Sequence, residues 1–276
     1  MNTLRAWLPV FPAYATPLDK AGWWLLRAAC VGVLLFLLLP ILVIVPLSFS
    51  DSSFLAYPIP GWSLKWYRNL FESAEWTRAA KNSFIVAPAA TLLATVLGTL
   101  AAVGLARTQF AFKGTVMSLL IAPMVVPIVV VGVSTYLFFA QIGLADSYTA
   151  LIVVHAALGA PFVLTTVLAT LQGFNHNLVR ASLSLGADPV RTFFRITLPV
   201  IAPGVISGAL FAFATSFDEV VVTLFLAGPN QVTLPRQMFT GIRENITPTI
   251  AAVATLLILF TTALLAVLEW LRGRRR

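Results

Sequence analysis

Residues 25–49 read LLRAACVGVLLFLLLPILVIVPLSF, an apolar run interrupted by a single charge, Arg27. About 20 consecutive apolar residues in a helix cross the roughly 30 Å hydrocarbon core of a bilayer. The run is continuous rather than alternating, and in lipid only helices and closed barrels satisfy their backbone hydrogen bonds. We therefore predict a membrane-spanning helix at this place.

Further runs of the same kind follow along the chain. The predicted spans cover about 25–49, 84–106, 116–139, 148–171, 200–226 and 250–271. The 276 residues are 59% hydrophobic and only 10% charged, whereas soluble domains carry about 25% charged residues. The fold class that we predict is an all-α membrane protein with six transmembrane helices. We expect the lipid bilayer to surround these helices.

The basic residues predict the orientation of the chain. The net charge of +8 comes from residues that stand mostly singly between apolar runs, which indicates topology signals rather than nucleic-acid binding. With six spans, twelve of the 18 Lys and Arg residues fall on the side that holds both termini. The other six are Lys65, Arg68, Arg78, Lys81, Arg236 and Arg243. Because cytoplasmic loops carry an excess of Lys and Arg, we expect both termini in the cytoplasm.

This topology divides the chain into three parts. We expect a cytoplasmic N-terminal segment over 1–24, a six-helix transmembrane domain over 25–271 and a basic cytoplasmic tail over 272–276. The aromatic-rich outer segment after the first span predicts a short interfacial helix near residues 63–71. The outer segment after the fifth span predicts a turn followed by a short helix.

Residues 180–199 of the long inner loop read RASLSLGADPVRTFFRITLP. Gly186 suits the left-handed end of one helix, and Asp188 with Pro189 suits the cap and first turn of a second. The apolar side of this helix–turn–helix consists of Leu185, Val190, Phe193, Phe194 and Ile196. Such a side predicts docking to another protein, and the alternative is an amphipathic helix that rests on the membrane.

This stretch resembles the coupling motif of the membrane subunits of type I ABC importers. That motif begins with Glu-Ala-Ala, continues to a glycine and ends in hydrophobic-x-Leu-Pro. The matching residues are Ala181, Leu185, Gly186, Ala187, Ile196, Leu198 and Pro199. Arg180 stands where the family usually has an acid, and Ser182 replaces the second alanine. The resemblance implies a coupling segment over about 176–199 that contacts an ATPase through Arg180, Ala181, Leu185, Gly186, Ala187, Asp188, Pro189, Phe193, Leu198 and Pro199.

Two adjacent acids, Asp218 and Glu219, interrupt the apolar run over 200–226. A charge at the centre of a transmembrane helix costs about 2.5–3.5 kcal/mol, so such acids face a bundle interior or a wet path. On one continuous helix the two side chains would point about 100° apart. The functional interpretation is a path for a cation. The alternatives are an ion pair, a helix contact, or an acid that is buried in its protonated form.

Aromatic residues and prolines are weaker candidates. Phe213, Phe217 and Tyr136 are placed to contact an alkylammonium chain through cation–π attraction, and packing is the alternative. Pro123 and Pro127 predict a kink in the third span. The two histidines are far apart in sequence, and we expect no metal site.

The stretch over 216–229, SFDEVVVTLFLAGP, resembles the spermidine/putrescine branch of these permeases. So do GWSLKWY over 61–67, the pair Asn82-Ser83, and Leu234-Pro235. The resemblance implies a type I ABC importer permease fold with a cytoplasmic coupling helix, in a bacterial inner membrane. It also implies as partners a second permease, two ATPase subunits and an extracytoplasmic solute-binding protein.

No phosphate-binding Gly-x-x-x-x-Gly-Lys-Ser/Thr sequence occurs, so we expect no cofactor and no catalysis in this chain. ATP and Mg²⁺ would belong to the ATPase subunits. The substrate favoured by the acid pair is a polyamine. The alternatives are an opine, an amino acid or a related amine carried by the same kind of importer, an ion-coupled secondary transporter, and a membrane-embedded enzyme or scaffold.

Overall fold

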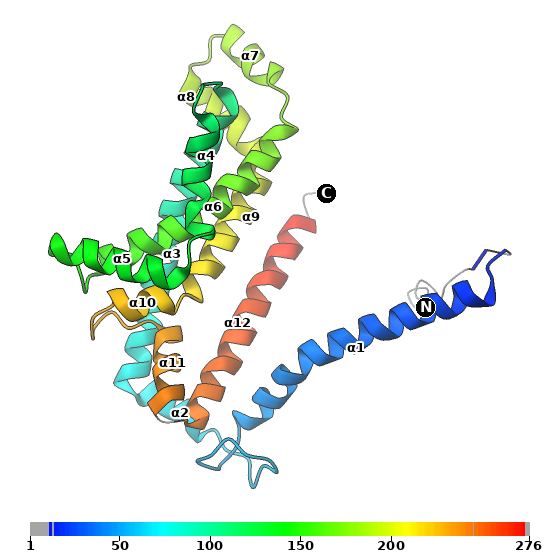
Figure 1. Ribbon diagram of the computed structural model, residues 1–276, viewed down its shortest axis with the longest axis vertical. Helices are drawn as coiled ribbons and strands as arrows, with labels where there is room; N and C mark the ends of the chain where they lie inside the picture. Colours follow the sequence, from blue (N-terminus) through cyan, green and yellow to red (C-terminus); the bar gives the residue numbers. More distant parts are fainter. Residues whose placement is uncertain (1–10, 13, 245, 274–276) are drawn as a thin grey trace. The chain divides into compact units, whose positions relative to one another are not determined.

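The computed structural model describes residues 11–12, 14–244 and 246–273 (Figure 1). Apart from one isolated β-bridge between Ser50 and Trp62, the regular elements of these residues are all helices. The chain divides into two compact units, one formed by residues 1–69 and 246–276 and the other by residues 70–245.

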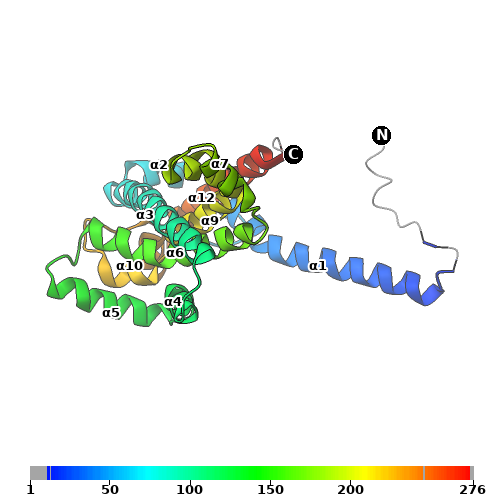
Figure 2. The same ribbon diagram turned by 90° about the horizontal axis from the view of Figure 1, so that it is seen from above.

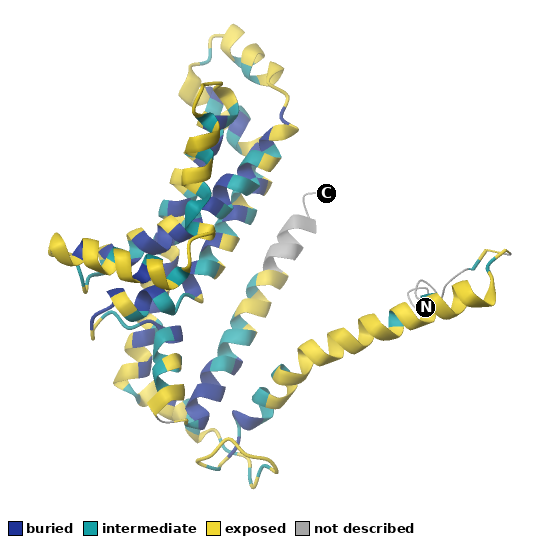
Figure 3. Cartoon of the chain, viewed as in Figure 1, coloured by how far each residue is buried: buried dark blue, intermediate teal, exposed yellow. Residues whose placement is uncertain are grey.

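The first unit holds α1 (Pro17–Leu47) and α12 (Pro248–Gly273), which contact each other. A capping box starts α1: the Thr16 hydroxyl accepts from the Asp19 N–H at 3.2 Å, and the Asp19 carboxylate accepts from the Thr16 N–H at 2.9 Å. Most of α1 is apolar and exposed (Figure 3). A long helix that is apolar on all sides suits lipid, and it begins earlier than the predicted first span.

The predicted interfacial helix is α2 (Lys65–Glu72). Two of its aromatic residues hold it against the end of α1. The Trp66 indole N–H donates to the Ser50 carbonyl at 2.8 Å, and the Tyr67 hydroxyl lies 2.7 Å from the Ser48 hydroxyl. The aromatic residues of this outer segment therefore also tie it to the first span.

The second unit is built on three helices that pack side by side (Figures 1 and 2): α3 (Ala74–Arg107), α6 (Tyr148–Gln172) and α9 (Leu198–Phe217). Glycines allow these helices to approach closely. A Cβ atom on Gly98 of α3 would lie 2.7 Å from the Cβ atom of Val163 in α6. A Cβ atom on Gly159 of α6 would lie 2.9 Å from that of Ala212 in α9. Small residues at contacts are typical of membrane helix bundles.

The third predicted span is broken in the structure. It consists of α4 (Lys113–Ile121), a 3₁₀ turn (Ala122–Met124) and α5 (Ile128–Gln141), and the two halves are bent by 98°. The predicted kink is confirmed, since Pro123 lies in the turn and Pro127 directly precedes α5. Five helices of the described residues are long and apolar enough to span a membrane, or six when the bent pair counts as one span.

The prediction of one continuous fifth helix over 200–226 is wrong. The long helix α9 ends at Phe217, and a separate short helix, α10 (Val221–Leu226), begins after Asp218–Val220. Both α5 and α10 run across the direction of the three-helix bundle, and they pack on each other (Figures 1 and 2). The predicted short outer helix is α11 (Leu234–Glu244).

Candidate functional site

The loop over 176–199 forms the predicted helix–turn–helix, with α7 (Asn177–Ser184) followed by α8 (Pro189–Thr192). Gly186 has a φ of +82°, a left-handed conformation that glycine adopts without a steric penalty. The Asp188 carboxylate accepts a hydrogen bond from the Arg191 N–H at 2.8 Å. This bond caps α8 and lowers the pKa of the Asp188 carboxyl. The predictions of a left-handed Gly186 and of a helix cap at Asp188 are therefore confirmed.

A π-helical turn over Phe193–Thr197, which the sequence pattern does not predict, connects α8 to α9. Two buried hydroxyl groups connect residues 192–197 to neighbouring helices. The Thr192 hydroxyl lies 3.0 Å from the Ser182 hydroxyl of α7, and the Thr197 hydroxyl accepts from the Arg107 guanidinium of α3 at 3.4 Å. The exposed loop is thus fixed to the end of a core helix.

The apolar side of the loop is largely uncovered in this chain. Leu185 is 88% exposed, Val190 66% and Phe194 59%. Phe193 and Ile196 are less exposed than these three, since both are half-buried. Among the other residues of the predicted ATPase contact, the exposed ones are Arg180, Ala181, Gly186, Asp188, Pro189 and Pro199, and the half-buried ones are Ala187 and Leu198.

The acid pair lies in the break between α9 and α10, rather than on adjacent positions of one helix. Asp218 is exposed, and its N–H still donates to the Ala214 carbonyl of α9 at 3.1 Å. The half-buried Glu219 carboxylate accepts from the Val222 N–H at 2.9 Å and so satisfies the first turn of α10. Asp218 is therefore the more exposed of the two acids, while the Glu219 carboxylate bonds to the first turn of α10.

Two of the three predicted aromatic residues meet beside this break. The rings of Phe213 and Phe217 stack with centroids 5.3 Å apart. The ring of Phe84, from α3, packs edge-on against Phe217 at 5.5 Å; the sequence did not single it out. Tyr136 lies apart from these rings in sequence, on α5, where it is exposed.

The buried His155, to which the sequence pattern assigns no role, also contacts both sides of the break. His155 of α6 is 1% exposed. Its Nδ1 atom lies 2.9 Å from the Ser216 hydroxyl, and its Nε2 atom lies 3.2 Å from the Thr223 hydroxyl. The available signal was a lone polar ring within an apolar run, which by itself indicates no partner.

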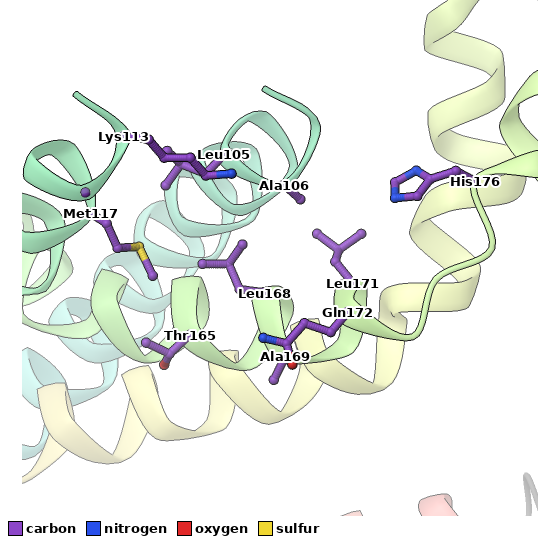
Figure 4. Close-up of a pocket in the computed structure, with 11 residues that line it drawn as sticks. Leu105, Ala106, Lys113, Met117, Thr165, Leu168, Ala169, Leu171, Gln172 and His176 are labelled. Atoms are coloured by element: carbon purple, nitrogen blue, oxygen red, sulfur yellow. The ribbon is translucent and has the colours of Figure 1, made fainter. Parts of the chain in front are cut away.

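A cavity of about 580 Å³ opens near the other end of α6, beside α3 and α4 (Figure 4). Its walls include Leu168, Leu171 and Met117, and its polar groups include Lys113 and His176. It has no acidic lining residue. A cavity with a basic side chain and no acid does not suit a cation, so we do not assign the substrate path to it.

The loop after α10 is held to α3 by a buried amide. The Asn82 side chain donates to the Asn230 and Val232 carbonyls at 2.9 and 2.8 Å, and it accepts from the Tyr148 hydroxyl at 2.7 Å. The Ser83 hydroxyl accepts from the Leu234 N–H at 2.8 Å. The pair that the family pattern singled out therefore fixes the loop between α10 and α11.

Comparison with known proteins identifies the family of this chain. Residues 94–276 match the family model described as "Binding-protein-dependent transport system inner membrane component". The chain is 33% identical over 229 residues to the spermidine/putrescine transport system permease protein PotC of Haemophilus influenzae, covering 83% of this chain and 89% of that protein. It is 34% identical over 230 residues to the putrescine transport system permease protein PotI of Escherichia coli (strain K12), covering 81% and 82%.

Solved structures support the same fold. A chain from the crystal structure of a bacterial ABC transporter involved in the import of the acidic polysaccharide alginate matches with a TM-score of 0.76, covering 94% of this chain and 99% of that one at 12% identity. A chain from the bacterial alginate ABC transporter in complex with an alginate pentasaccharide-bound periplasmic protein matches with a TM-score of 0.65 at 20% identity, covering 91% and 92%. The chain therefore belongs to the binding-protein-dependent transport system inner membrane component family and is a permease subunit of an ABC importer.

Proposed function

We propose that this permease forms part of the path for a small organic cation, and that the cation is a polyamine. The observation that carries the proposal is the exposed Asp218 in the helix break, beside the stacked rings of Phe213 and Phe217. A carboxylate attracts an ammonium group, and aromatic faces attract the same cation at short range. The relatives named as spermidine and putrescine permeases support this substrate class over other amines.

The proposal includes the rest of the importer. A second permease completes the path, two ATPase subunits bind ATP and Mg²⁺, and an extracytoplasmic binding protein delivers the substrate. The chain spans the inner membrane over 25–271 with both termini in the cytoplasm, following the excess of Lys and Arg on that side. The segment over 176–199, whose exposed apolar residues include Leu185 and Phe194, receives the motion of the ATPase subunits.

The substrate is tested by uptake into cells that lack their own polyamine importers. Cells that express the complete importer take up labelled spermidine or putrescine, and we expect unlabelled polyamine in excess to suppress that uptake. Arginine, an opine and a neutral sugar in the same excess serve as matched competitors, and we expect them to leave it unchanged. Uptake of labelled spermidine and putrescine no higher than in cells without the importer would overturn the polyamine assignment.

A further inference from the structure

His155 connects the two helices on either side of the acidic break. Ser216 lies in the last turn of α9, and Thr223 lies in the first turn of α10. The imidazole ring bonds to the first hydroxyl through Nδ1 at 2.9 Å and to the second through Nε2 at 3.2 Å. One side chain of α6 thus links the residues that flank Asp218–Val220, where α6 contacts both α9 and α10 (Figure 1).

One assignment of the ring proton gives every group in this chain of hydrogen bonds a partner. The Thr223 hydroxyl donates to the Glu219 carbonyl at 3.2 Å, so its oxygen accepts from the ring. In this assignment Nε2 carries the proton, and Nδ1 accepts from the Ser216 hydroxyl. The hydrogen bonds run in one direction, from α9 through the ring to the backbone of the acidic break.

Filling space does not by itself require this arrangement. A site surrounded by helices is filled as well by an apolar side chain of similar volume. The hydroxyls of serine and threonine within helices are commonly satisfied by a carbonyl one turn earlier in their own helix. The two bonds satisfy the buried ring nitrogens, and because their partners lie on different helices they also tie the end of α9 to the start of α10.

We propose that His155 is a positioning residue that holds the break between α9 and α10 so that Asp218 stays directed at the substrate path. The inference rests on the proposed cation path at Asp218. His155 itself does not contact the substrate. It acts through the backbone of the break, by way of Ser216 and Thr223.

A double-mutant cycle tests this dependence in the complete importer, with labelled spermidine uptake as the readout. We expect His155→Leu to lower the uptake rate about tenfold, which corresponds to about 1.4 kcal/mol, the size of one or two net hydrogen bonds. In an Asp218→Asn background the same change should lower the remaining rate less than twofold. His155→Gln keeps a donor and an acceptor on one planar group, and it should restore at least half of the wild-type rate. Thr165→Val, on the same helix but bonded only within it, is the matched control and should have no effect.

A second readout does not depend on the role of Asp218 in transport. The single cysteine, Cys30, is replaced by alanine and Asp218 by cysteine, and a cationic methanethiosulfonate reagent labels the new thiol in the assembled importer. We expect His155→Leu to change the labelling rate at least fivefold and His155→Gln to change it less than twofold. An unchanged labelling rate in His155→Leu would overturn the inference. If Asp218→Asn transports normally while the labelling rate still shifts, the proposed cation path fails and the positioning role of His155 stands.

Discussion

Asp218 and Glu219 are neighbours in sequence, yet their carboxylates have different surroundings. Asp218 is exposed at the end of α9, and Glu219 accepts the Val222 N–H in the first turn of α10. A side chain that caps a helix end contributes about 1 kcal/mol, and an amide oxygen keeps part of that contribution. At the residue scale, only Glu219 therefore has a structural role in capping α10.

For Glu219, we expect Glu219→Ala to lower the unfolding temperature of the purified importer complex, with a loss of about 1 kcal/mol. Glu219→Gln should lose less than half of that, because its amide oxygen still accepts the Val222 N–H. Thermal unfolding of the complex in lipid nanodiscs measures both variants. Equal losses in the two variants would contradict the capping role.

Gly186 gives a second prediction at this scale. Its φ of +82° strains any residue with a Cβ atom by about 1–3 kcal/mol, and asparagine tolerates the left-handed region better than alanine does. We expect ATP-driven uptake to decrease in the order Gly186→Asn, Gly186→Ala, Gly186→Pro. Gly173→Ala is the control, since Gly173 also has no atom close to its missing Cβ but has a negative φ of −92°. Normal uptake in Gly186→Pro would refute the coupling assignment.

The residue-scale features that the sequence predicts are the local ones. The caps at Gly186 and Asp188 depend on neighbours within a few residues, so composition and spacing are sufficient to predict them. The contact of His155 with Ser216 and Thr223 joins residues 61 and 68 positions apart. No periodicity in a single run encodes which face of α6 meets α9 and α10.

At the scale of elements, composition predicts where apolar helices lie but not every place where they stop. The bend between α4 and α5 has a local cause in Pro123 and Pro127, and the kink is predictable. The break after Phe217 has neither proline nor glycine, and apolar residues continue on both sides of it. Side-chain bonds from Glu219 and His155 hold this break, so only the packed structure reveals it.

Helix packing gives an element-scale prediction on α3. Gly98→Val would place its Cβ atom 2.7 Å from that of Val163, and relieving such a clash by separating two packed helices costs about 1–3 kcal/mol. We expect this variant to unfold at a lower temperature and to yield less assembled complex. Gly104→Val is the matched control on the same helix, because Gly104 has no atom within 4 Å of its missing Cβ. Equal stability of the two variants would show that the close approach of α3 and α6 is not needed.

At the scale of the whole molecule, the sequence identifies a membrane protein and, through the coupling motif, an importer subunit. Exposed apolar residues outside the long spans then need a partner. We expect Leu185→Asp to reduce copurification of the ATPase subunits about tenfold, because a desolvated charge at an interface costs more than about 1.4 kcal/mol. Ile242→Asp makes the same change from an exposed aliphatic side chain to a carboxylate on α11, and it should keep the ATPase subunits bound. Retention of the ATPase by Leu185→Asp would place the coupling surface elsewhere.

The most direct test of a polyamine path at Asp218 is the initial rate of labelled spermidine uptake into proteoliposomes that hold the complete importer, with ATP enclosed and binding protein added. We expect wild-type uptake to require both ATP and the binding protein. We expect Asp218→Asn to lower the rate at least tenfold, while the complex assembles normally and Glu219→Gln retains most of its uptake. A wild-type rate in Asp218→Asn would contradict the account.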